Sequence, residues 1–269
     1  MMKNLGRYWG LTNISLQKAM SYRFAFFTSF LGDVIKTGVM LAVWMAVYRQ
    51  RSTIAGFDYP MMITYLLLSQ VLNSVYGFQN DAERTISHKI RDGSIQFDLL
   101  KPVSFTTARL AENMGTTLLQ VMLAVLILLG FRIFMPELSG PASVTDGLLF
   151  LVSAVAGYFT MYTVSIMSGL ISFWLMSSWG LRNARVAIIN FLSGSLMPLS
   201  ILPGWLQTAA ELLPFKNIVY TPVMIYMGQY TGTEALLQIG LQLIWGVGLW
   251  LLAKGLFALA IRRVSINGG

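Results

Sequence analysis

The sequence contains no cysteine, a single histidine and few charged residues. The absence of cysteine excludes disulfides, thiolate metal sites and a cysteine nucleophile, although it does not identify the compartment. With His88 as the only histidine, the paired histidines of a zinc site are excluded as well. No glycine-rich phosphate loop is present, and no polar segment is longer than about 35 residues. A nucleotide-hydrolysing domain therefore has no place in this chain.

Apolar sequence is what the chain has in abundance. Hydrophobic residues make up 55% of its 269 residues and charged residues only 11%, against roughly 25% in a soluble globular domain. The mean hydropathy is +0.64. Because a helix needs about 20 apolar residues to cross about 30 Å of hydrocarbon, several spans fit but little else does. We therefore expect one all-α integral membrane domain over residues 1–269, embedded in a lipid bilayer.

The apolar runs and the breaks between them predict six transmembrane helices. The predicted spans are residues 24–48, 59–78, 113–135, 146–175, 184–201 and 234–259. Ser143, with Asp146 three residues later, predicts a capped helix start ahead of the fourth span. Residues 1–23 have no uninterrupted apolar core, so we expect no cleavable signal peptide there. Their apolar residues recur at helical spacing among basic ones, which favours an interfacial helix over a frayed cytoplasmic tail.

The basic residues give this arrangement an orientation. The formal net charge is +8, which in a soluble protein would suggest nucleic acid. In a membrane protein the positions of Lys and Arg report the cytoplasmic side, so we expect no nucleic-acid partner. With both termini cytoplasmic, 14 of the 19 Lys and Arg residues face the cytoplasm and four face outward, and Lys36 lies inside the first span.

The longest polar stretch, residues 80–112, is predicted to be a cytoplasmic loop. Ile86 and Ile90 share one face of a short charged helix, and Gly93 is placed to end that helix in the left-handed conformation. After Gly93 the pattern alternates, which predicts an extended segment with Phe97 on its apolar edge. Such an edge either binds a partner or packs beneath its own membrane bundle.

Two further features lie within the apolar regions. Asp33 and Lys36 are three residues apart in the first span, so they can form an ion pair on one helical face. Such a pair is either structural or part of a substrate pathway, because intramembrane charges are costly and often functional. Residues 202–230 are apolar but broken by prolines and glycines. This pattern predicts short helices that re-enter the membrane from one face, since irregular backbone is tolerated at depth when protein covers it.

Two stretches resemble a known family of transporters. Residues 90–102, I-R-D-G-S-I-Q-F-D-L-L-K-P, resemble the loop between the second and third spans of type-2 ABC transporter permeases. Residues 192–206, L-S-G-S-L-M-P-L-S-I-L-P-G-W-L, followed by L-L-P-F-K-N at 212–217, resemble the region after the fifth span of the same family. The resemblance covers nearly the whole chain in span order and is strongest to a subgroup of poorly characterised bacterial permeases.

The resemblance implies roles for particular residues. The first loop would be a coupling helix that docks on a separate ATP-binding subunit, with the ATPase-coupling residues Glu83, Ile86, Ile90, Gly93, Phe97 and Leu100. The second stretch would form outer re-entrant helices, with the gate residues Pro203, Trp205, Pro214, Phe215 and Pro222. Residues 1–23 match the interfacial helix with which the family begins.

The resemblance also implies a biological setting. The chain would be the permease subunit of an ATP-binding-cassette exporter in the bacterial inner membrane, working by alternating access. It would pair with an identical or homologous permease and with two copies of a cytoplasmic ATPase. ATP and Mg would bind that partner, so this chain would bind no cofactor and be no enzyme itself.

Two other functions remain open at this stage. An ion-coupled secondary transporter would use Asp33 and Lys36 as coupling groups, but the two similar halves typical of that class are not visible. A membrane-embedded enzyme should show a cluster of His, Asp or Glu near the interface, and the sequence lacks one. The sequence leaves open the substrate, the residues lining the pathway and the choice between homodimer and heterodimer.

Overall fold

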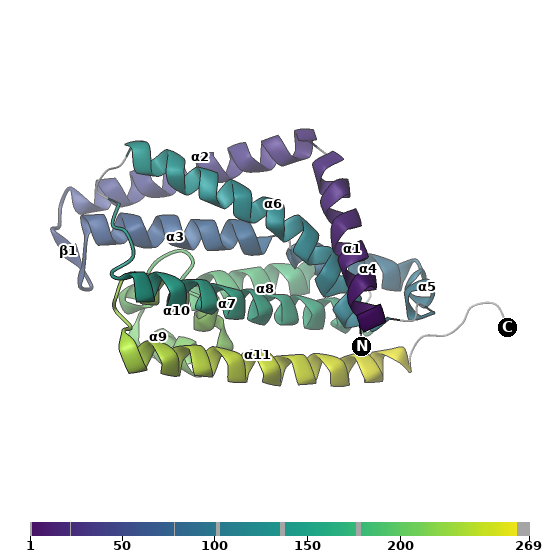
Figure 1. The fold of residues 1–269 in the computed structure, drawn as a ribbon. Helices are drawn as coiled ribbons and strands as arrows, with labels where there is room; N and C mark the ends of the chain where they lie inside the picture. The colour runs from purple at the N-terminus through teal and green to yellow at the C-terminus, as the bar shows by residue number, and fades with distance from the viewer. Residues whose placement is uncertain are drawn as a thin grey trace.

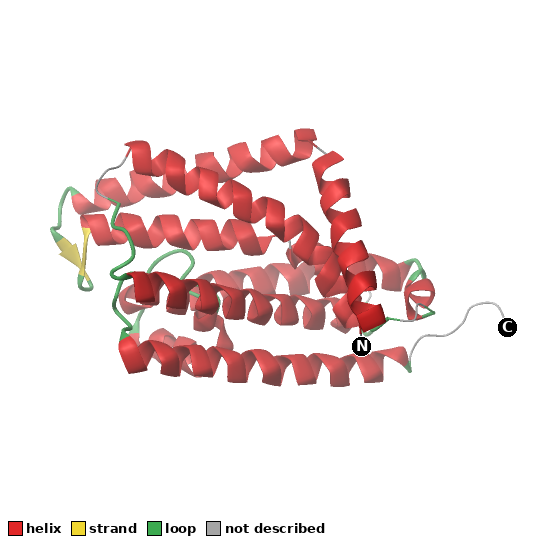
Figure 2. Ribbon diagram, viewed as in Figure 1, coloured by secondary structure: helices red, strands yellow, loops and turns green. Residues whose placement is uncertain are grey.

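A computed structural model describes residues 2–21, 23–77, 79–100, 103–134, 138–175 and 179–262. Within these ranges the protein is almost entirely helical, with one short β-hairpin (Figure 2). The long helices are α1 (Met2–Ser21), α2 (Arg23–Tyr48), α3 (Tyr59–Gly77), α4 (Gln79–Arg91), α6 (Phe105–Phe134), α7 (Val144–Ile171), α8 (Trp179–Leu192) and α11 (Gly232–Ile261). The short elements are β1 (Thr53–Ile54), β2 (Phe57–Asp58), α5 (Ile95–Leu99), η1 (Leu199–Ile201), α9 (Gly204–Leu212), η2 (Pro214–Asn217) and α10 (Tyr220–Tyr226).

Five segments of the described chain are long and apolar enough to cross a membrane. They lie in α2 from Phe30 onward, in α3 together with α4, in α6, in α7 and in α11. The predicted fifth span, residues 184–201, is not among them, because α8 has 14 residues and ends at Leu192. At 1.5 Å per residue such a helix is about 21 Å long, shorter than the hydrocarbon core. The protein is thus a multi-pass membrane protein, and its six-span arrangement stays a prediction.

The helices form two groups that meet at α7. Helices α2, α3 and α6 pack together, and α11 packs along α7, while α4 and α10 also contact α7 (Figure 1). Helix α1 lies across α6 at the end of the molecule where α4, α5 and the end of α11 gather, and the hairpin lies at the opposite end. Helix α1 is held there by a hydrogen bond from Thr12 Oγ1 to the Ala111 carbonyl of α6 (2.8 Å). Gly115 allows this crossing, because a Cβ there would overlap the backbone oxygen of Thr12.

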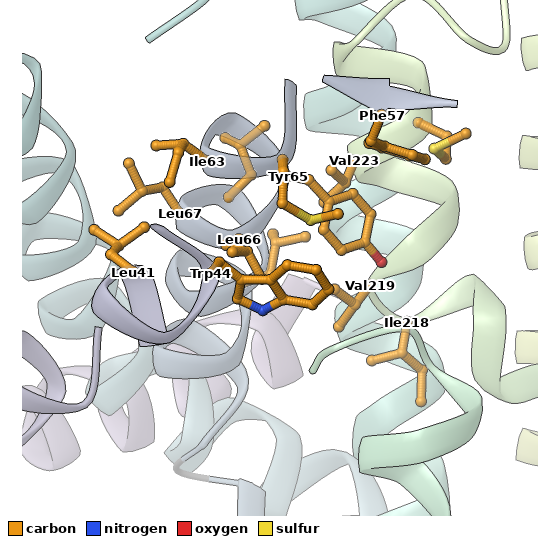
Figure 3. Close-up of a cluster of buried hydrophobic side chains, with 14 of the residues drawn as sticks. Leu41, Trp44, Phe57, Ile63, Tyr65, Leu66, Leu67, Ile218, Val219 and Val223 are labelled. Atoms are coloured by element: carbon orange, nitrogen blue, oxygen red, sulfur yellow. The ribbon is translucent and has the colours of Figure 1, made fainter. Parts of the chain in front are cut away.

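The largest hydrophobic core lies between α2, α3 and the segment around η2 and α10 (Figure 3). Trp44 of α2, Tyr65 of α3 and Val223 of α10 are all buried in it. The Tyr65 hydroxyl donates a hydrogen bond to the Gly194 carbonyl (2.5 Å), so this core also fixes the turn after α8. Gly194 has φ +75°, and an added Cβ would lie 2.6 Å from that hydroxyl. Glycine is therefore required there by both conformation and space.

The start of α7 follows a simple capping rule. Ser143 caps α7, because its hydroxyl accepts a hydrogen bond from the Asp146 backbone nitrogen (3.0 Å). This confirms the helix start predicted from the sequence. Between α2 and α3, the strands β1 and β2 pair as an antiparallel hairpin, with Ile54 opposite Phe57. Ala55 and Gly56 turn it with positive φ angles of 48° and 86°.

Candidate functional site

The loop predicted to contact an ATPase folds into α4 and α5 at the end of the molecule that also holds the start of α1 (Figure 1). Gly93 ends the charged helix with φ +73°, which confirms the predicted left-handed position. Asp92 supports the turn by accepting a hydrogen bond from the Ser94 backbone nitrogen (2.9 Å). Hydrogen bonds from the Ser94 side chain and backbone, and from His88, lower the pKa of Asp92. Its carboxylate is therefore charged at neutral pH.

The segment after Gly93 is helical, and the extended apolar edge predicted there is wrong. In α5, Ile95 and Asp98 are three residues apart and face inward together, while Phe97 points away from them and is 64% exposed. Alternation would instead have placed Ile95 and Phe97 on one side. The helix is favoured over an extended segment because it turns the Asp98 carboxylate inward, where its ion-pair partners lie.

Asp98 ties α5 to both neighbouring helices. Its Oδ2 is 2.5 Å from Lys89 Nζ of α4 and 3.0 Å from Arg109 Nη2 of α6. Arg109 is itself buried and pairs with Glu112 (2.6 Å). Two cationic partners offset the cost of burying the Asp98 carboxylate, so this cluster holds α5 more firmly than a single exposed ion pair would. The segment Gly93–Leu100, called the tip below, is therefore held in place against α4 and α6.

The six predicted coupling residues fall into two sets. Glu83 and Ile86 are 1% and 0% exposed, so neither offers surface to a partner in this structure. Ile90 is half-buried, and Gly93 is an exposed turn residue. Phe97 is 64% exposed and Leu100 is 82% exposed, although both are large and apolar. The surface available for a partner is thus at Phe97 and Leu100.

Glu83 and Ile86 hold α4 against the rest of the protein instead. Glu83 Oε2 is 2.6 Å from Arg185 Nη2 of α8, and Arg185 Nη1 donates to Ser165 Oγ of α7 (2.6 Å). Ile86 packs on Gly169 of α7, where an added Cβ would lie 3.1 Å from the Ile86 Cβ. Helix α4 is therefore packed tightly on α7 and bound to α8 by a buried ion pair.

Asp33 and Lys36 line the same cavity, but the ion pair expected between them is not formed in the described part of the chain. Asp33 instead accepts hydrogen bonds from two side chains of α3. Ser74 Oγ donates to Asp33 Oδ2 (2.7 Å), and Gln70 Nε2 donates to Oδ1 (3.4 Å). Lys36 is exposed.

The cavity lies where the two helix groups meet and has a volume of about 410 Å³. Helix α2 contributes Asp33 and Lys36, and α8 contributes Asn190 together with apolar Val186 and Ile189. The remaining polar side chains of its lining are Gln70, Asn73, Ser74, Tyr76 and Gln120. This size is within the range of about 300–1,000 Å³ typical of small-molecule sites.

The predicted re-entrant region folds as the short helices η1, α9, η2 and α10. Pro203 precedes α9, and Trp205 in its first turn is 74% exposed. Pro214 begins η2 and is buried, Pro222 is buried within α10, and Phe215 is half-buried. Gln242 of α11 anchors this region by donating a hydrogen bond to the Asn217 carbonyl (2.7 Å). Entry of these helices into a membrane stays a prediction.

Comparison with known protein families matches residues 34–268 to the ABC-2 family transporter proteins. The chain belongs to the ABC-2 transporter family. This match covers most of the chain and all the apolar helices after the start of α2, so the protein is a membrane transporter permease. ABC-2 membership implies partnership with an ABC ATPase. No protein with curated information matches the chain.

Sequence reasoning missed several residues that organise this ABC-2 permease. The sequence patterns did not single out Asp98, Arg109 or Arg185. One signal was available, because Arg109 and Glu112 are three residues apart and can pair on one helical face. Helix α6 accordingly begins at Phe105, ahead of the predicted span start at residue 113. No local pattern could have paired Glu83 with Arg185, since they meet only through the fold.

Proposed function

We propose that this ABC-2 permease exports its substrate by alternating access, driven by a separate ATPase that contacts the tip Gly93–Leu100. The observation that carries the proposal is the exposure of Phe97 and Leu100 on a helix held in place by buried charges. Large apolar side chains that project from a rigid support favour burial against a partner. The tip lies at the end of the molecule that also holds the start of α1 and the end of α11 (Figure 1). Basic residues occur in the helices at this end, among them Arg7, Lys89 and Arg109, which supports a cytoplasmic position.

A push on this tip has a continuous route to the cavity. Lys89 and Asp98 join α5 to α4 (2.5 Å), and Glu83 and Arg185 join α4 to α8 (2.6 Å). In the sequence, Arg185 is followed directly by Val186, which lines the cavity. Removing one partner of a buried ion pair costs about 3–5 kcal/mol, so α4 and α8 move together rather than separate.

In this mechanism the ATPase changes which face of the permease is open. Two ATPase subunits that close on ATP and Mg push the tips of two permeases, one of them this chain and the other identical or homologous. The nucleotide shifts the equilibrium only because the contacts at the tip differ between the two states. The re-entrant helices with Trp205 and Phe215 then form the outer gate. Both termini lie in the cytoplasm, and the membrane is the bacterial inner membrane.

The test is retention of the ATPase. The permease is co-expressed with its partner ABC ATPase, purified in mild detergent, and the bound ATPase per permease is measured. The variant Phe97→Asp with Leu100→Asp should retain less than a tenth of the ATPase bound by the parent chain, since about 1.4 kcal/mol is tenfold in affinity. The matched control Leu212→Asp changes an exposed leucine in α9 and should leave retention unchanged. Full retention by the double variant would overturn the proposal.

A further inference from the structure

The cavity between the two helix groups carries one acidic and one basic side chain. Asp33 and Lys36 are the charged residues of its lining, and the other polar groups there are neutral amides and hydroxyls. The lining therefore has no net charge when both groups are ionised. A ligand that carries charge of one sign can pair with only one of Asp33 and Lys36, whereas a ligand with one charge of each sign can pair with both.

The two charges are kept apart in the structure. Asp33 is oriented toward α3 by Ser74 (2.7 Å) and Gln70 (3.4 Å), and it makes no ion pair with Lys36 among the described residues. Lys36 therefore has an ammonium group available to a ligand. Asn73, Gln120 and Asn190 add hydrogen-bonding groups from three different helices.

We propose that this cavity binds a zwitterion, with its ammonium group toward Asp33 and its carboxylate or phosphate toward Lys36. The inference rests on the transport function proposed above and names the class of substrate. Apolar side chains of the lining, among them Ile189 and Ile218, accommodate an attached apolar group. The ligand is either a free zwitterion or the headgroup of a lipid, because both present the same pair of charges.

Equilibrium binding to the purified full-length chain in nanodiscs of anionic lipid tests the proposal. The probes are radiolabelled glycerophosphoethanolamine, which is zwitterionic, glycerol 3-phosphate, which is anionic, and ethanolamine, which is cationic. Dihexanoylphosphatidylethanolamine is a second zwitterionic probe with acyl chains. At least one zwitterionic probe should bind roughly 10- to 100-fold more tightly than either the anionic or the cationic probe, because a charge-assisted hydrogen bond contributes about 1.5–3 kcal/mol. Binding of the short-chain lipid alone would identify a lipid headgroup, and equal binding of both zwitterions would identify a soluble ligand.

Variants assign the two charges. Asp33→Asn and Lys36→Gln should each weaken binding of the zwitterionic probe by roughly 10- to 100-fold. Exchange of the two charges, Asp33→Lys with Lys36→Asp, should restore part of that affinity, which also shows that the fold survives. Arg49→Gln, outside the cavity at the end of α2, should have no effect. Absence of binding by both zwitterions, or binding unchanged in Asp33→Asn, would overturn the proposal. Because no ATPase is needed, this result is separate from the retention experiment.

Discussion

The buried ion pair between Glu83 and Arg185 predicts a large and strongly non-additive effect on stability. Its two side chains are 1% and 6% exposed and lie 2.6 Å apart. Arg185→Met removes the cation but leaves Glu83 in the same packed site, and it also removes the bond to Ser165. Loss of one partner of such a pair costs about 3–5 kcal/mol, because the remaining charge is uncompensated.

The double variant Glu83→Gln with Arg185→Met should be more stable than the single Arg185→Met variant. Replacing both charges removes the uncompensated carboxylate, and such replacements are often nearly neutral. Equilibrium unfolding in mixed micelles of increasing SDS fraction, followed by tryptophan fluorescence, measures the four free energies of unfolding of the double-mutant cycle: the parent, Glu83→Gln, Arg185→Met and the double variant. A coupling of about 2 kcal/mol or more is expected from contact across a buried pair. Additive effects of the two substitutions would show that the pair does not bind α4 to α8.

Three further predictions concern the same end of the molecule. Gly169→Ala should destabilise the protein by about 1–3 kcal/mol, because its Cβ would press on Ile86, whereas Gly255→Ala meets no neighbouring atom and should not; thermal unfolding followed by size-exclusion chromatography separates the two. Gly93→Ala should cost about 1 kcal/mol, because φ is +73° there, and Gly93→Asn should cost less; equal stability of the two variants in the SDS titration would contradict the left-handed turn. Asp98→Asn should expose the α5 tip to limited proteolysis and lower ATPase retention, and an unchanged cleavage pattern would contradict its role as an anchor.

The apolar helices could be predicted from the sequence because their length is set by the bilayer. Helices α2, α3 and α11 begin and end within two residues of the predicted spans at 24–48, 59–78 and 234–259. The hydrophobic run and its polar ends are local properties, so no knowledge of packing is needed. The segment after residue 184 was harder to predict, because its short helices and turns are held by groups that are distant in the sequence. The Tyr65 hydroxyl on Gly194 is one such group.

The candidate sites were harder to predict, because they depend on tertiary contacts that the spacing of residues along the sequence does not reveal. Asp33 and Lys36 are correctly spaced for an ion pair on one helix, yet the Asp33 carboxylate accepts a hydrogen bond from Ser74 of α3 instead. Glu83 and Ile86 were predicted to contact an ATPase, yet α7 and α8 bury both. Local patterning identifies which face of a helix is apolar, but it does not identify what covers that face.

In the proposed arrangement the exposed α5 tip lies in the cytoplasm and is covered by the ATPase. Because the chain has no cysteine, single cysteines at Leu100, in the tip, and at Thr53, in the hairpin, can be labelled with a membrane-impermeant maleimide. This arrangement predicts that the reagent labels only Thr53→Cys in intact cells, that it labels Leu100→Cys in inverted vesicles, and that added ATPase protects Leu100→Cys. Labelling of Leu100→Cys from outside intact cells, or no protection by the ATPase, would contradict it.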